Sequence, residues 1–470
     1  MPLSKKHNNI KRSFILSILK IVNEEYNFPW FKKEKEMIET IIIAVLTCFS
    51  LICSILFFQK IKIKKFEIST YWIICFIGAI LMLCFGCVGF DDVVAGLFQD
   101  SAINPIKILL LFISMTFLSI FLDEVGFFRF LANLLVKHFK SNQKLLFLTL
   151  YLMVAVLTVF TSNDIVILTF TPFICYFSKN AKINPIPYLV AEFAAANTYS
   201  MMLIIGNPTN IYLATSSNID FLSYLEVMWL PTLVCGVVQF GIMFLLFHKS
   251  LSIKIEASVE QVKIKSKLDL TFGLVSLFSC LILLILSSYI NFDMWLICII
   301  CALVLLLSII ITHLVRHKSL KIILNTTKRL PFTLIPFVIS MFVIVLALNK
   351  QGITEIIGNF LGEDYLILKY GTSSFLSSNL INNIPMSVLF SNIINLPNEA
   401  LRNQAIYSTI IGSNLGAFFT PVGALAGIMF MDLVKKQDIK FSFLMFLKYG
   451  SIVMIPTLFV ALGMLSVFFY

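Results

Sequence analysis

Charged residues are scarce in this chain of 470 residues: only 13% are Asp, Glu, Lys or Arg, whereas 59% are hydrophobic. Soluble proteins average about 25% charged and about 45–50% apolar residues. A globule of this length could not cover so much apolar surface with so few charges. The composition therefore excludes a soluble enzyme, a disordered chain and a nucleic-acid-binding protein, and it indicates a polytopic membrane protein whose solvent is the lipid bilayer.

Motifs for enzyme chemistry are also missing. The chain has no HExxH, no GxSxG and no phosphate-binding Gly-Lys-Ser/Thr run, so intramembrane proteolysis and direct ATP coupling have no support. We therefore expect neither an enzyme nor a cofactor. No secretory signal with a small-residue cleavage site is visible at the start of the sequence.

Residue types that bind metals occur in two notable spacings. Ten cysteines, all in apolar stretches, include the CxxC pairs Cys84/Cys87 and Cys298/Cys301. These pairs are interpreted as small apolar residues one helical turn apart rather than as a soft-metal site, because no polar neighbours favour a thiolate. His313 and His317 lie at a helix end within a basic cluster that has no acidic third ligand. No metal site is therefore expected.

Long apolar runs predict the membrane crossings, each of about 20 residues. They lie near 38–58, 71–90, 106–126, 186–216, 222–247, 269–290, 293–314, 331–349, 404–433 and 442–469. Two other apolar stretches, about 143–178 and 366–395, carry polar residues in their middle. The net charge of +11 comes from clusters between the runs, and those at 60–65, 129–144, 249–267, 316–329 and 435–440 are predicted to be cytoplasmic. Acidic or neutral loops alternate with them only if both interrupted stretches are re-entrant hairpins.

The same order of elements occurs twice. A first repeat over 38–247 and a second over 269–470 each hold five crossings and one hairpin, and a cytoplasmic linker at 248–268 joins them. An odd number of crossings gives the second repeat the opposite orientation, which is the inverted-topology architecture of many secondary transporters. Pro172 and Pro208 are 36 residues apart, as are Pro385 and Pro421. Residues 1–37 form a basic segment whose side of the membrane stays open.

Four polar islands interrupt the apolar sequence and are predicted to form the binding site. A helix broken at membrane depth exposes backbone groups that only protein or a watery cavity can satisfy, and Gly, Pro, Asn, Ser and Thr suit such breaks. The freed groups can also coordinate a solute or an ion. The predicted site residues are Ser162, Asn163, Asp164, Gly206, Asn207, Pro208, Thr209, Asn210, Ser377, Ser378, Asn379, Asn382, Asn383, Thr420, Pro421 and Gly423.

Three intramembrane acids are candidates for a proton or cation relay: Asp164, Glu192 and Asp123. Asp164 could also cap the second arm of its hairpin. The Asp123-Glu124 pair has an alternative role as an ion-pair partner of Arg129. Because no island contains Lys or Arg, the predicted site suits a cation or a neutral solute better than a multiply charged anion.

At these islands the chain resembles a known family. The segments that carry the resemblance are LSIFLDEVGFFRFLANLLVKHF, TSNDIVILTFTPF, GNPTNIYLA, FLSSNLINNIPMSVL and GSNLGAFFTPVGALAGIMF. They are similar to the bacterial arsenite/antimonite permeases (ArsB) of the ion transporter superfamily, which includes the NhaD-type antiporters and the dicarboxylate/sodium symporters (DASS). The resemblance implies an elevator-type homodimer in which hairpin tips and broken helices hold the coupling ion and the substrate.

The leading hypothesis is a secondary active transporter of a small inorganic ion, oxyanion or metalloid. It would act in the bacterial cytoplasmic membrane, coupled to H+ or Na+, by elevator-type alternating access. One alternative is a sodium-coupled symporter of a dicarboxylate- or sulfate-like anion. An alternative from a different class is a passive ion channel.

Overall fold

The computed structural model describes residues 29–58, 60–63, 66–98, 104–139, 142–253, 264, 266–290 and 292–469. Within them the chain is helical, apart from one antiparallel ribbon. The expectation of an all-α protein is therefore corrected at 60–69, where a basic loop was predicted. Most of the basic segment 1–37 and of the linker 248–268 lies outside the described residues.

The first half of the chain runs from α2 to α11. Its elements are α2 (Pro29–Phe57), β1 (Lys60–Ile63), β2 (Phe66–Ser69), α3 (Thr70–Cys84), α4 (Phe90–Phe98), α5 (Pro105–Val125), α6 (Phe127–Phe139), α7 (Gln143–Phe160), α8 (Asn163–Asn180), α9 (Ile186–Tyr199), η1 (Ile204–Gly206), α10 (Pro208–Ser216) and α11 (Phe221–Phe247). A short turn, η2 (Ser250–Ser252), follows α11.

The second half begins with two long apolar helices and ends with another. Its elements are α12 (Lys267–Ile290), α13 (Met294–Val315), α14 (Lys321–Lys328), α15 (Leu334–Lys350), α16 (Ile353–Leu361), α17 (Leu366–Ile381), α18 (Asn383–Ile393), α19 (Glu399–Gly416), α20 (Leu425–Lys436) and α21 (Phe443–Ser466).

Seven described helices are long and apolar enough to cross a membrane: α2, α5, α7, α11, α12, α13 and α21. The pair α15 and α16 meets the same criterion as one span bent by 78°. The predicted crossings at 186–216 and 404–433 are each two helices, because their polar islands separate α9 from α10 and α19 from α20. The crossing predicted at 71–90 is shorter than expected, since α3 ends at Cys84.

Local sequence explains where several helices begin and end. The Asn104 side chain accepts hydrogen bonds from the backbone N–H groups of Ile106 and Lys107, which starts α5. Gly126 adopts φ 93° and ends it, a left-handed conformation that glycine tolerates best. Asn142 and Asn398 cap α7 and α19 in the same way as Asn104.

The proline spacing proves to be a poor guide to equivalent positions. The break between α7 and α8 is at residues 161–162, and Pro172 lies well inside α8. The break between α17 and α18 is at Asn382, and Pro385 lies in the first turn of α18. The two prolines therefore occupy different places relative to the helix breaks, although both are followed by a proline 36 residues later.

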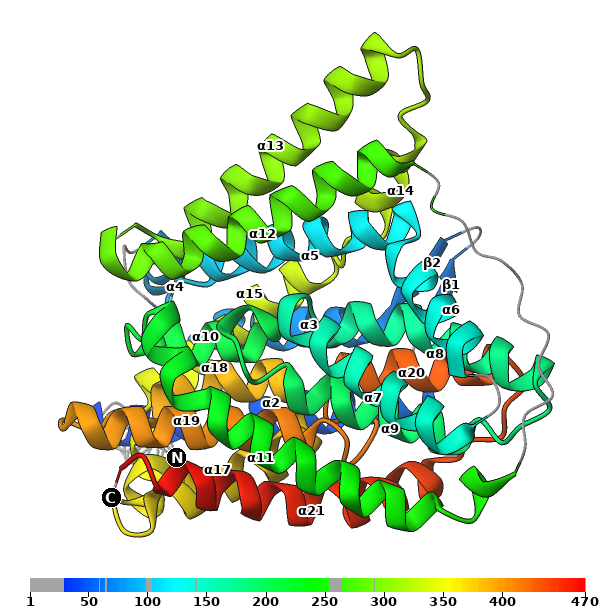
Figure 1. The fold of residues 1–470 in the computed structure, drawn as a ribbon. Coiled ribbons are helices and arrows are strands. Elements are labelled where there is room, and N and C mark those ends of the chain that lie inside the picture. The colour runs from blue at the N-terminus through cyan, green and yellow to red at the C-terminus, as the bar shows by residue number, and fades with distance from the viewer. Residues whose placement is uncertain are drawn as a thin grey trace, which may run out of the picture.

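Helices from the two halves are interleaved (Figure 1). In space α5 packs against α12 and α13, α3 against α15, α8 against α20, and α11 against α21. The α12 and α13 pair projects from one end of the molecule, whereas α11 and α21 lie along the opposite end. Between these ends, the broken helices of both halves meet in the buried centre.

Small residues permit a close contact between α17 and α19. A Cβ added to Gly412 would lie 2.1 Å from the carbonyl oxygen of Gly371 and 2.1 Å from the Ser374 hydroxyl oxygen. Helix pairs inside a membrane gain stability from this kind of close approach, because lipid does not drive apolar surfaces together.

We expect Gly412→Ala to destabilise the protein by about 1–3 kcal/mol, since the added methyl must push α17 and α19 apart. The measurement is the thermal unfolding midpoint of the purified protein in detergent. Gly463→Ala is the matched control, because an added Cβ there meets nothing within 4 Å. Equal midpoints for the two variants would contradict the packing argument.

Candidate functional site

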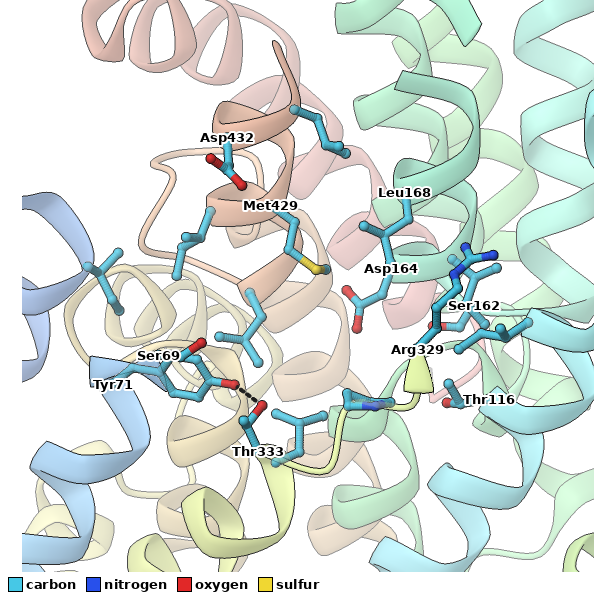
Figure 2. A pocket seen from close by; sticks show the side chains of 18 of the residues that line it. Ser69, Tyr71, Thr116, Ser162, Asp164, Leu168, Arg329, Thr333, Met429 and Asp432 are labelled. Atoms are coloured by element: carbon cyan, nitrogen blue, oxygen red, sulfur yellow. Dashed lines mark hydrogen bonds between the residues drawn. The ribbon is translucent and has the colours of Figure 1, made fainter. Parts of the chain in front are cut away.

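A cavity of about 410 Å³ lies where both halves of the chain meet (Figure 2). Its walls come from α2, α3, α5, the start of α8, the connection between α14 and α15, and α20. The polar residues that line it are Ser54, Ser69, Thr70, Tyr71, Thr116, Ser162, Asp164, Arg329, Thr333, Asp432 and Lys436. The remaining lining is mostly apolar, so few polar groups decide what the cavity can hold.

The break between α7 and α8 places one island at the cavity wall. Ser162 is extended, with φ −144° and ψ 145°, and precedes the first turn of α8. The Thr161 hydroxyl donates to the carbonyl of Leu157 at 2.7 Å, which satisfies a backbone group freed at the end of α7. The Asn163 side chain donates to the Asn197 side-chain oxygen at 3.1 Å and thereby ties this break to α9.

Asp164 lies in the first turn of α8, and its carboxylate points into the cavity (Figure 2). Its backbone N–H bonds the Asn163 side chain at 2.9 Å. Within the described part of the chain, the Asp164 carboxylate has neither a hydrogen bond nor an ion pair. A carboxylate among apolar walls is costly to leave unpaired, so this group is suited to binding a cation or a proton.

Arg329 corrects two predictions about charge. Its guanidinium lines the cavity and donates at 2.7 Å to Asp123 and at 2.7 Å to Glu124. The partner of the Asp123-Glu124 pair is therefore Arg329 of the second half rather than Arg129. The site is also not free of positive charge, since Lys436 lines it as well, with its ammonium 2.9 Å from Asp432.

The charges of the cavity still favour cations. Each lining cation is matched by a carboxylate: Arg329 by Asp123 and Glu124, and Lys436 by Asp432. Asp164 adds one more carboxylate without a paired cation in the described chain. The two cations and four carboxylates thus leave the cavity and its surroundings with an excess of negative charge. Such an excess attracts cations and repels anions.

Asn414, on α19, joins the second and fourth islands. Its side-chain oxygen accepts from Asn207 at 3.0 Å and from the Ser200 hydroxyl at 2.9 Å. Its amide nitrogen donates to the Asn210 side chain at 2.7 Å. These groups are fully buried, so the broken helix of the first half is fixed to α19 of the second half by amide–amide bonds.

The third and fourth islands are bonded to each other. The Asn379 side-chain oxygen accepts from the backbone N–H of Thr420 at 2.9 Å and from its hydroxyl at 2.7 Å. Asn382 donates to the carbonyl of Val422 at 2.9 Å, and the N–H of Asn383 donates to the carbonyl of Gly423 at 3.0 Å. These bonds satisfy backbone groups that the helix breaks at 382 and 417–424 expose.

The predicted site residues thus separate into two groups. Of these residues, Ser162 and Asp164 line the cavity of about 410 Å³, whereas Asn163 bonds a neighbouring helix. The residues that lie in the buried interior are Gly206, Asn207, Thr209, Asn210, Asn382, Asn383, Pro421 and Gly423. Asn379 and Thr420 are half-buried and bond each other. Pro208 lines a separate cavity of about 20 Å³. Ser377 is half-buried on α17, and Ser378 donates to the carbonyl of Phe375 at 2.9 Å.

Glu192, the third candidate relay acid, lies outside the cavity. It is fully buried on α9, and the Thr171 hydroxyl lies 2.9 and 3.1 Å from its two carboxyl oxygens. Thr171 is seven residues beyond Asp164 on α8, so the two residues lie two turns apart on one face, about 10 Å along the helix.

Several lining residues were not identified from the sequence. Arg329 and Lys436 were assigned to cytoplasmic charge clusters, and Thr116 belongs to an uninterrupted apolar run. A polar residue in such a run marks a helix that faces protein, but the run does not show which other helix it will face. Asn414 was part of the fourth island but was not selected as a site residue.

Within the described residues, no group of three or more His, Cys, Asp or Glu side chains is arranged to hold a metal ion. His313, which the sequence places in a basic loop, is buried and bonds Asp269 at 3.2 Å. Cys298 has its sulfur 3.9 Å from that of Cys280, which in turn lies 3.6 Å from the Met115 sulfur.

A bundle of apolar helices, several of them broken around a buried polar centre, is the fold of a polytopic membrane transporter. The crystal structure of the Alcanivorax borkumensis YdaH transporter matches it with a TM-score of 0.52 at 12% identity, covering 92% of this chain and 97% of that one. Residues 55–410 match the family model described as Citrate transporter (CitMHS). The chain belongs to this family of transporters.

Relatives that are 25% identical to the chain support the same class. An arsenical pump membrane protein of Yersinia enterocolitica is 25% identical over 376 residues, which cover 76% of this chain and 85% of the relative. One of Escherichia coli is 25% identical over 411 residues, which cover 83% and 92%. The resemblance seen in the sequence is confirmed. The chain is a secondary transporter of small solutes, not an enzyme, and a multi-pass protein of the bacterial cytoplasmic membrane.

We expect Arg329→Gln to destabilise the protein by about 3 kcal/mol, because it leaves the buried Asp123 carboxylate unpaired. Adding Asp123→Asn should recover most of that loss. The unfolding midpoint of the purified variants measures both effects. Lys328→Gln, at an exposed neighbouring residue, is the control. A double variant no more stable than Arg329→Gln alone would exclude this origin of the effect.

Proposed function

We propose that this transporter moves a small inorganic ion, oxyanion or metalloid against H+ or Na+, by an elevator-type alternating-access mechanism. The observation that carries the proposal is the Asp164 carboxylate, which faces the cavity at a helix break without a partner in the described chain. A coupling ion bound there would neutralise the carboxylate. The names of the arsenical pump relatives support arsenite or antimonite as the first solutes to test.

The balance of charge supports a cation or a neutral solute at this cavity. An anionic substrate would meet an excess of carboxylates, whereas a neutral metalloid hydroxide would not. A second hollow, of about 780 Å³, shares Asp432 with the cavity and is lined by Lys435 and Lys440 of a predicted cytoplasmic loop. A passage between the two hollows past Asp432 would give Asp164 access from the cytoplasm.

The order of elements supports two related halves. In each half two longer helices and one short helix precede a helix with a shorter successor. Two broken pairs and one long helix follow. The pairs α7–α8 and α9–α10 correspond in order to α17–α18 and α19–α20. Inverted repeats of this kind change access by moving one part of the protein against another. We extend the proposal to a homodimer on the basis of the family resemblance.

A sodium-coupled anion symporter is the second candidate. It is favoured by the two cavity cations, Arg329 and Lys436, and by the description of the family as citrate transporters. For such a substrate to bind, Arg329 or Lys436 would have to leave its present carboxylate partners. The two candidates therefore differ in whether neutralising Arg329 or neutralising Asp164 abolishes substrate binding.

We expect Asp164→Asn to lower gradient-driven transport by about tenfold or more, because a bond to a charged group contributes about 1.5–3 kcal/mol. The measurement is uptake of arsenite, antimonite, phosphate, sulfate or citrate into everted vesicles under an imposed pH or sodium gradient. Asp91→Asn, at an exposed acid on α4, is the matched control.

Unchanged gradient-driven uptake by Asp164→Asn would mean that the carboxylate has only a structural role. Solute movement that follows only its own gradient, whatever the gradient of H+ or Na+, would identify a channel instead. Loss of citrate uptake on neutralising Arg329, with Asp164→Asn still active, would favour the anion symporter.

A further inference from the structure

Three sulfur atoms meet where α5, α12 and α13 pack together, and each helix contributes one of them. The Cys280 sulfur of α12 lies 3.6 Å from the Met115 sulfur of α5 and 3.9 Å from the Cys298 sulfur of α13. All three residues are buried, and each pair of these helices is in contact (Figure 1). The sequence groups Cys298 with Cys301 on one helix, whereas the structure adds sulfur donors from two other helices.

Hydrogen bonding does not use all the donor capacity of this sulfur cluster. A thiol carries a single hydrogen, so Cys280 can donate to Met115 or to Cys298 but not to both at once. Cys235 on α11 shows the ordinary local alternative, because its thiol donates to the carbonyl of Thr232 at 3.3 Å. The three clustered sulfurs therefore keep lone pairs that can bind an ion.

We infer that Met115, Cys280 and Cys298 form a binding site for a soft monovalent metal ion of the Cu+ and Ag+ class. Thiolate and thioether sulfur are the ligands that such ions prefer. A three-coordinate ion about 2.3 Å from each sulfur, the length of a zinc–thiolate bond, would hold the sulfurs about 4 Å apart. The two measured separations, 3.6 and 3.9 Å, are close to that spacing, so small side-chain movements suffice to admit an ion.

The donor set does not suit zinc. Zinc sites use at least three ligands from Cys, His, Asp and Glu, and a thioether is not among them. The described residues contain no group of three such side chains arranged to hold a metal ion. Two cysteines and one methionine instead match the sulfur ligands of a soft monovalent ion.

Binding of the ion releases one proton. The S–H bond of one cysteine breaks, its electron pair forms the bond to the metal ion, and the proton passes to the solvent. The other cysteine coordinates as a neutral thiol and Met115 as a thioether. The complex then has no net charge, which suits its apolar surroundings. No polar neighbour is needed to hold the thiolate, since the bound ion does so.

The sulfur site adjoins the transport cavity without belonging to it. Met115 immediately precedes Thr116 on α5, and Phe112, Thr116 and Ile120 line the cavity. An ion bound by three helices would cross-link them, so it should stabilise the protein and restrain α5 as a cavity wall. The inference does not depend on which solute is transported.

The test is the unfolding midpoint of the purified full-length protein, titrated with silver nitrate in chloride-free buffer at constant ionic strength. Ag+ should raise the midpoint of the unaltered protein. Cys280→Ser should raise the half-effective Ag+ concentration at least tenfold, which corresponds to about 1.4 kcal/mol. Cys235→Ser removes a buried thiol of α11 and is the matched control, which should titrate like the unaltered protein.

X-ray absorption of the protein loaded with one equivalent of Cu+ gives a second readout. The unaltered protein should show three sulfur neighbours around copper and Met115→Leu only two. Met243→Leu, at a buried methionine of α11, is the control. Because Met115→Leu conserves volume, it keeps the inference testable if Cys280→Ser does not fold.

Three results would overturn the inference. The first is equal Ag+ titrations for folded Cys280→Ser and Cys235→Ser. The second is copper bound through nitrogen or oxygen in the unaltered protein, and the third is an unchanged count of sulfur neighbours in Met115→Leu.

Discussion

The structure depends on one constraint, namely that backbone groups exposed by a helix break cannot be left unbonded inside an apolar protein. Four such breaks lie in the centre of this chain, and asparagine side chains satisfy most of them. Asn379 and Asn382 bond the broken segment at 417–424, and Asn414 bonds Asn207 and Asn210. An asparagine can donate and accept at once, so one side chain can hold two breaks together.

This bonding divides the polar centre into two parts with different roles. The asparagine-rich part bonds its side-chain amides within the protein and fixes the broken helices of one half to those of the other. The part around Asp164 has unsatisfied oxygens and opens into a cavity. A transport site needs both parts, because a ligand must find free donors while the broken helices that present them stay folded.

Buried charges, like the backbone groups at the helix breaks, must have partners inside the protein. Arg329 reaches from the α14–α15 connection to Asp123 and Glu124 at the end of α5, and it neutralises carboxylates that could not otherwise stay buried. Arg329 and Lys436 are therefore each paired with a carboxylate. Asp164 is the cavity carboxylate that has no paired cation in the described chain. The proposed preference for a cation thus rests on the one carboxylate that is left over when the other charges near the cavity are paired.

The sequence by itself determined the class of protein, the approximate position of most helices and the location of the four helix breaks. These features are local, since hydropathy sets the spans and Gly, Pro and Asn set the breaks. Only the tertiary structure decided that Arg329 rather than Arg129 pairs with Asp123, that Asn414 links the second and fourth islands, and that Thr116 lines the same cavity as Asp164. Each of these contacts joins residues from separate helices, often from opposite halves, and the spacing of residues along one helix carries no information about which neighbour it will meet.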